Sequence, residues 1–122
     1  MILADTSVWI DHLRAADPSM LKLLGDGHVL MHPMVVAELA LGTLRDRRRT
    51  LFVLDALRQV KVAQLAEVRT LIEAHSLYAK GIGLTDAHLL ASCLLTPGTQ
   101  LWTRDGALRS VAQTLGVLAS IP

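Results

Sequence analysis

The first fourteen residues, Met1–Arg14 (MILADTSVWIDHLR), decide the fold. Ile2 to Ala4 form an apolar run of strand length, and Asp5 follows it directly. Thr6 opens a segment with helical spacing, so the pattern predicts a buried strand that turns into a helix at a carboxylate. Aspartate is a common helix N-cap, and a carboxylate in this position also suits a metal ion. Asp5 alone leaves both interpretations open.

The rest of the chain repeats the alternation of strand and helix. Strand-length apolar runs occupy residues 1–4, 28–32, 60–65, 99–103 and 116–120. Helical spacing predicts helices over 6–14, 18–25, 34–44, 48–59, 66–81, 85–95 and 105–116, with Thr85 as the N-cap of the sixth. Such alternation requires crossover connections and a parallel sheet covered on both faces. We therefore expect residues 1–122 to form a single α/β domain, a three-layer α/β/α sandwich with a central parallel sheet.

The composition bounds the class of protein. Hydrophobic residues make up 52% of the 122 residues and aromatic residues 3%, which favours an α/β core over a β-sandwich. The net charge of +1 gives no overall electrostatic attraction to nucleic acid, so any binding of nucleic acid needs a local patch of positive charge. Cys93 is the single cysteine, which fits a reducing cytoplasm. We expect no signal peptide and no membrane span.

Four acids stand in unusually apolar surroundings. Asp5 follows a strand, Asp86 is the only charge between Lys80 and Arg104, and Asp105 comes shortly after the apolar run at 99–103. Glu38 lies in a helix that is apolar on every side, so we expect it to be largely buried, with its partner elsewhere in the chain. Helix capping could explain each aspartate singly. A shared site explains all four at once.

Acids gathered at one place repel one another unless a cation lies among them. Because carboxylate oxygens are hard ligands, this set favours Mg²⁺ or Mn²⁺, and no His and Cys pattern with zinc spacing competes. Asp5 and Asp105 both follow predicted strands, at the sheet edge where parallel α/β folds bind ligands. A metal held there by acids suits phosphoryl chemistry.

Four stretches carry a resemblance to a known family: LADTSVWIDHL, VVAELALG, GIGLTDAHLLAS and LWTRDGAL. In order and spacing they resemble the four acidic motifs of the PIN-domain nucleases, and most closely those of the bacterial VapC-type toxins. The resemblance covers nearly the whole chain. It implies a three-layer α/β/α fold and an endoribonuclease that hydrolyses RNA phosphodiester bonds through a water activated by Mg²⁺ or Mn²⁺. It also implies a small cognate antitoxin that blocks the active site, and a homodimer.

Carried over residue by residue, the resemblance makes Asp5, Glu38, Asp86 and Asp105 the catalytic and metal-binding acids. Thr6, Ser7 and Thr103 match the hydroxyl positions of the family beside the first and last acids. The chain departs from the family at Ala107 and Leu108, where many relatives carry a further acid and then a phenylalanine. This departure predicts that a second metal ion binds weakly, or only with substrate present.

Basic residues near these motifs are candidate phosphate contacts. Four arginines fall within five residues, and further cations flank the third and fourth acids; the predicted RNA-binding residues are Arg45, Arg47, Arg48, Arg49, Lys80 and Arg104. A solvated helix start explains the arginine run equally well.

Two other functions remain open. A PIN fold could bind RNA or a protein partner without cutting. A receiver-type signalling domain also gathers acids and Mg²⁺ at a sheet edge, but Asp55 lies within a helical pattern and position 104 is an arginine where that class needs a late lysine.

Overall fold

Three short parallel strands form the centre of the molecule. The computed structural model describes residues 1–122 and contains β1 (Ile2–Ala4), β2 (Val29–Leu30) and β3 (Gln100–Trp102). The strand order is β2–β1–β3, so the first strand of the chain is the central one. Leu3 is paired with Leu30 on one side and with Leu101 on the other.

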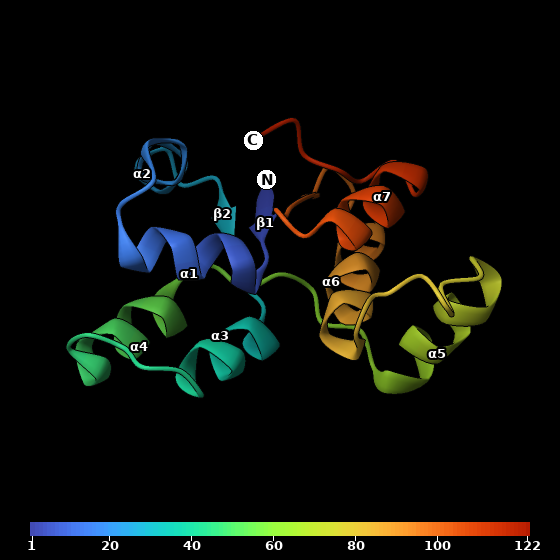
Figure 1. Ribbon diagram of the computed structural model, residues 1–122, viewed down its shortest axis with the longest axis horizontal. Coiled ribbons are helices and arrows are strands. Elements are labelled where there is room, and N and C mark those ends of the chain that lie inside the picture. The colour runs from blue at the N-terminus through green and yellow to red at the C-terminus, as the bar shows by residue number, and fades with distance from the viewer.

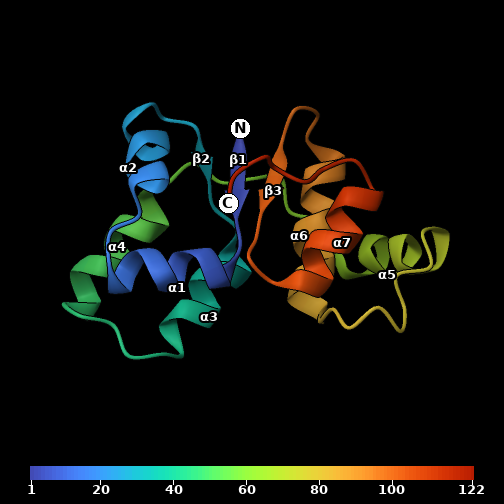
Figure 2. The same cartoon turned by 45° about the horizontal axis from the view of Figure 1, so that its top comes forward.

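Seven helices enclose this sheet. Figures 1 and 2 show one group of helices on one side of the strands and a second group on the other, which confirms the predicted α/β sandwich. The first group is α1 (Thr6–Arg14), α2 (Pro18–Gly25), α3 (Pro33–Ala40) and α4 (Arg47–Ala56). The second is α5 (Leu65–Ala74), α6 (Leu84–Leu95) and α7 (Gly106–Thr114). None of these helices has the length and apolarity needed to cross a bilayer.

The two expected outer strands, 60–65 and 116–120, are reduced to single bridges. Gln59 bridges to Met31, and Leu118 bridges to Leu101. Ladder hydrogen bonds remain at each point: the Val60 amide donates to the Met31 carbonyl at 2.9 Å. The inner strands are only two or three residues long, so the outer segments find few backbone groups with which to continue a ladder.

Several helix boundaries differ from the sequence-based expectation; α4, expected over 48–59, ends at Ala56, and α7, expected over 105–116, ends at Thr114. The helix expected over 66–81 ends at Ala74, because Ser76 and Ala79 adopt left-handed backbone angles that a right-handed helix excludes. Thr85 lies inside α6, whose N-cap is Gly83. Helix α3 stops at Ala40, four residues earlier than expected.

The core is one large cluster of buried side chains around the sheet. Leu3, Leu101 and Trp102 of the strands are fully buried. Cys93 on α6 is buried with them, and this burial raises the pKa of its thiol to about 12, so the thiol stays protonated and unreactive at neutral pH.

Candidate active site

The predicted acids lie at the carboxyl edge of the sheet. Asp5 follows the central strand β1, and its amide donates to the Trp102 carbonyl of β3 at 2.9 Å. The chain passes from β1 to β2 on one side and later to β3 on the other. This change of direction at β1 is the topological switch point where open α/β sheets bind their ligands.

Asp5 is buried and held by three donors. Its Oδ1 accepts from the Val8 amide at 3.1 Å and from Ser7 Oγ at 2.6 Å. Its Oδ2 accepts from Thr103 Oγ1. The residue is only 4% exposed. Asp5 therefore caps α1, and the same contacts fix the orientation of its carboxylate at the sheet edge.

Glu38 reaches this edge from α3. Its Oε1 accepts a 2.6 Å hydrogen bond from Thr6 Oγ1. The expectation of a largely buried Glu38 was wrong: the residue is exposed, as is Leu41, the C-cap residue directly after the same helix. Helix α3 is apolar all round but covers the sheet with one face only, so Glu38 opens to solvent beside the site.

Asp86 and Asp105 each stand at the start of a helix. Asp86 Oδ2 accepts from the Gly83 amide at 3.0 Å, and Asp105 Oδ1 accepts from the Leu108 amide at 2.9 Å. Both acids thus satisfy helix N–H groups, as the capping interpretation predicts. Asp86 is half-buried and Asp105 is exposed.

The negative charges of the other predicted acids act on the pKa of Asp86. Burial is the largest cause of a raised pKa at Asp86, and the hydrogen bond from Gly83 opposes it. The negative charges of the other three acids raise the pKa further; they are Asp5, Asp105 and Glu38. Acids from the end of β1, from α3 and from the β3–α7 junction thus all contribute to the raised pKa of Asp86 on α6.

The predicted hydroxyl residues connect these acids. Thr103 Oγ1 donates to Asp5 and accepts from the Asp105 amide at 3.1 Å, so one side chain links the first and last acids. Ser7 Oγ donates to Asp5 and accepts from the Arg104 amide at 3.4 Å. These contacts orient the carboxylates without occupying all of their lone pairs.

The donor set fits a hard divalent cation held partly through water. No three His, Cys, Asp or Glu side chains are gathered closely enough to form a complete metal site. Mg²⁺ needs no such cage, because it keeps several waters and is bound through one or two carboxylates together with substrate phosphates. Asp5 and Glu38, each fixed by a hydroxyl group, are the residues best placed to bind it directly.

Arg104 is engaged within the protein. Its guanidinium pairs with Asp11 Oδ2 at 2.8 Å and with Asp17 Oδ2 at 2.6 Å, and it lies 5.4 Å from the ring centroid of Trp102. The sequence analysis missed Asp11 and Asp17. The pairs span 93 and 87 residues, a separation at which no local pattern relates the partners.

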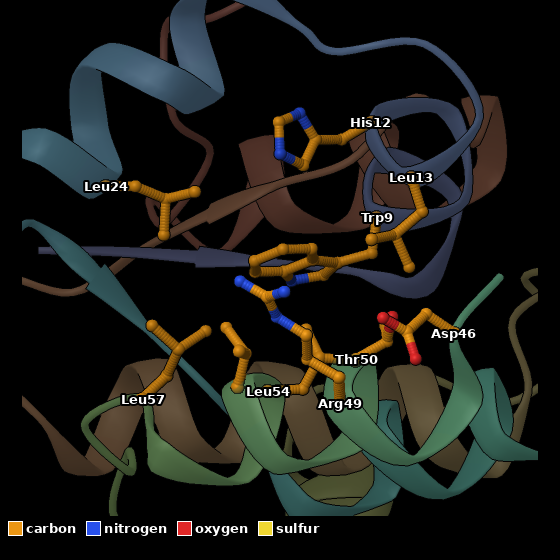
Figure 3. A pocket seen from close by; sticks show the side chains of 10 residues that line it. Trp9, His12, Leu13, Leu24, Asp46, Arg49, Thr50, Leu54 and Leu57 are labelled. Carbon is orange, nitrogen blue, oxygen red and sulfur yellow. The ribbon is translucent and has the colours of Figure 1, made fainter. Parts of the chain in front are cut away.

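The other predicted cations differ in their surroundings. Arg47 donates to the Ala40 carbonyl at 2.6 Å and so caps the end of α3. Arg49 extends toward Trp9 in an apolar pocket between α1 and α4 (Figure 3). Arg45, Arg48 and Lys80 are exposed and form no ion pair.

Comparison with known proteins identifies the chain. The profile of the PIN domain matches residues 2–113. The chain belongs to the PIN-domain family, and within it to the VapC type. It is 46% identical over 117 residues to a protein named Ribonuclease VapC32 from two strains of Mycobacterium tuberculosis, an alignment that covers 96% of this chain and 94% of the relative. The family predicted from the four acidic motifs is thus confirmed, and the receiver-type alternative is excluded.

Proposed function

We propose that this protein is an endoribonuclease that hydrolyses RNA with Mg²⁺ or Mn²⁺ bound among Asp5, Glu38, Asp86 and Asp105, and that it acts as the toxin of a toxin–antitoxin pair. The observation that carries the proposal is the orientation of the Asp5 and Glu38 carboxylates by hydroxyl groups at the carboxyl edge of the sheet. The raised pKa of Asp86, to which the charges of the other three acids add, supports it. The likeness to a ribonuclease over nearly the whole chain supports the choice of RNA.

The residues of the chain have separable roles in this proposal. A divalent cation bound at the site would neutralise phosphate charge and lower the pKa of water. Asp5 and Glu38 present their carboxylates in orientations fixed by Ser7, Thr103 and Thr6. Asp86, whose pKa is raised by burial and by the neighbouring acids, would have its negative charge compensated by a cation bound there.

Further parts of the proposal concern assembly and location. Residues 1–122 act as a single domain, which is supported by the continuous core around the sheet and by the family match over most of the chain. A small cognate antitoxin, a homodimeric assembly and a cytoplasmic location follow from the VapC type of the chain and belong to the proposal as well.

Cleavage of single-stranded RNA tests the activity. The protein is incubated with RNA in Mg²⁺, in Mn²⁺ and in EDTA, beside Asp86→Asn and the exposed control Asp26→Asn. We expect metal-dependent cutting that is lost in Asp86→Asn and kept in Asp26→Asn. Asparagine keeps an acceptor for the Gly83 amide, so this loss would not reflect a lost helix cap.

The chemistry of the product ends tests the mechanism. Attack by water predicts fragments with 5′-phosphate and 3′-hydroxyl ends, whereas cyclic 2′,3′-phosphate ends would exclude it. Tight RNA binding without cutting in either metal would favour the second candidate function, a PIN fold that binds RNA or a partner without cleavage.

A further inference from the structure

A groove leads away from Glu38 along the surface of the first helix group. It encloses about 470 Å³ and is lined by residues of α1, α3, α4 and the loop between α3 and α4. Glu38 lines it, so the groove is continuous with the proposed site. Arg14 at the end of α1 and Arg45 in the α3–α4 loop also line it.

Both arginines in the groove are free. Arg14 and Arg45 are exposed, and neither side chain forms an ion pair or donates a hydrogen bond within the protein. Arg104 is neutralised by two aspartates, and Arg47 holds the end of α3. Arg48 and Lys80 are also exposed and unpaired, but they do not line the groove, whereas Arg14 and Arg45 line it together with Glu38.

The groove has the composition of a backbone-binding channel. Its lining contains no aromatic side chain, so it offers no platform on which a base could stack. Ile10 and Leu39 provide apolar walls between the charged groups. A guanidinium binds a phosphate through two parallel hydrogen bonds, which suits Arg14 and Arg45 to this ligand.

Charge balance also favours an RNA strand in this position. Four acids at the sheet edge repel the phosphates on either side of the bond to be cut. Two unpaired cations that line the same groove as Glu38 offset this repulsion where the strand leaves the site. A cavity of this size accommodates a ligand of small-molecule dimensions, so a single strand suits it better than a duplex.

We propose that this groove binds the backbone phosphates of single-stranded RNA next to the scissile bond, with Arg14 and Arg45 as the phosphate-binding residues. The inference rests on the proposed ribonuclease function and adds the path of the substrate. Because phosphate contacts position the strand without reading bases, the groove supplies affinity and register but little sequence preference.

RNA binding without cleavage tests the subsite. A fluorescein-labelled single-stranded oligoribonucleotide is titrated in EDTA, and its anisotropy is followed across a series of salt concentrations. For single strands, each lost phosphate contact makes the negative slope of log K against log salt shallower by about 0.7. We expect Arg14→Ala and Arg45→Ala each to reduce the magnitude of the slope by this amount, and the double variant by about 1.4.

Two controls make the result specific. Arg69→Ala, which removes an exposed arginine on α5 in the other helix group, should leave the slope unchanged. The loss of affinity in the double variant should be the same for oligouridine and oligoadenosine. Melting temperatures of all variants, measured in the same buffer, exclude unfolding as the cause.

The possible outcomes separate the subsite from the function. A double variant that keeps the wild-type slope overturns the subsite, while metal-dependent cutting by the wild type still upholds the ribonuclease. Failure of the wild type both to bind and to cut RNA overturns both. Wild-type RNA affinity in the double variant together with lost binding of an acidic antitoxin peptide would assign the groove to a protein partner and also overturn the proposal.

Discussion

Asp5 caps a helix and also lies in the proposed metal site, two roles that the sequence presented as alternatives. Its carboxylate caps α1 through the Val8 amide and accepts hydroxyl hydrogen bonds from Ser7 and Thr103 at the edge of the site. The capping contacts fix the geometry that the proposed chemistry needs. A residue can therefore act as a helix cap and as a metal ligand at once, and evidence for one role is not evidence against the other.

An asparagine substitution at Asp5 should lower the stability of the fold, whereas one at Asp86 should not. Asp5→Asn replaces a buried carboxylate oxygen by an amide donor that faces hydroxyl groups, and we expect a loss of about 1–3 kcal/mol in the free energy of unfolding. Asp86→Asn keeps the acceptor for Gly83 and removes a charge that its surroundings disfavour, so we expect an unchanged or raised melting temperature at pH 7. Thermal unfolding in EDTA measures both.

The expected effect of Asp86→Asn on folding stability follows from proton linkage. Its pKa is raised on folding, so the folded state holds the proton more tightly and loses stability as the pH rises from the ordinary pKa toward the raised one. Asp86→Asn should remove that loss. A melting temperature that falls in Asp86→Asn and holds in Asp5→Asn would reverse our assignment of which carboxylate supports the fold.

His32 should make the protein sensitive to acid. It is fully buried and caps α3 by accepting from the Met34 amide at 3.0 Å. Burial, and then the neighbouring His88, lowers its pKa to about 4 from 6.5. The unfolded chain therefore binds more protons between these values, and stability falls as the pH drops from about 6.5 toward 4. The total effect is on the order of 3 kcal/mol.

Urea unfolding across this pH range tests the role of His32. Asparagine at position 32 retains a capping acceptor and cannot be protonated. We expect His32→Asn to lose less stability than the wild type between pH 7 and pH 4.5. Equal losses in the two proteins would assign the acid sensitivity to other groups.

At the scale of elements, Arg104 ties the β3–α7 junction to the first helix group. It pairs with Asp11 on α1 and with Asp17 at the start of α2, and it sits between Thr103 and Asp105 in the chain. Its two ion pairs and its position over Trp102 hold the segment that carries the last acid. We therefore assign it a positioning role in place of the predicted RNA contact.

Arg104→Lys tests this positioning role. A lysine carries one compact ammonium group and lacks the planar fork that reaches both aspartates. We expect a loss of about 1 kcal/mol in stability, since partly exposed pairs contribute little, and a higher Mn²⁺ concentration for half-maximal cleavage because Asp105 is less fixed. Arg69→Lys serves as the matched control. A shallower dependence of RNA affinity on salt concentration in EDTA, with an unchanged Mn²⁺ requirement, would instead make Arg104 a phosphate contact.

At the scale of the whole molecule, features that depend on neighbouring residues could be predicted from the sequence, whereas contacts between distant segments could not. The alternation of apolar runs and helical segments placed all three strands and all seven helices, because each depends on neighbouring residues. It missed the exposure of Glu38, which depends on which face of α3 meets the sheet. It also missed the pairing of Arg104 with Asp11 and Asp17, since that depends on how the layers pack.

The sequence was enough to name candidate members of the proposed site, and it was not enough to predict the hydrogen bonds that join them. Four acids in apolar surroundings pointed to one place, and the electrostatics of Asp86 support that grouping. The hydroxyl links from Thr6 to Glu38 and from Thr103 to Asp5 join segments 32 and 98 residues apart. Such distances between partners are set by the fold as a whole.

The single bridges at the two margins of the sheet limit how the protein can associate. Gln59 and Leu118 each occupy a point on an outer strand, so β2 and β3 offer no continuous row of free N–H and C=O groups to another chain. Pairing of strands between two molecules, the common route to domain-swapped or fibrillar assemblies, has no template here. Helix side chains are then the surface that the fold leaves for any contact between copies, and surface substitution could change the specificity of such a contact while the sheet stays intact.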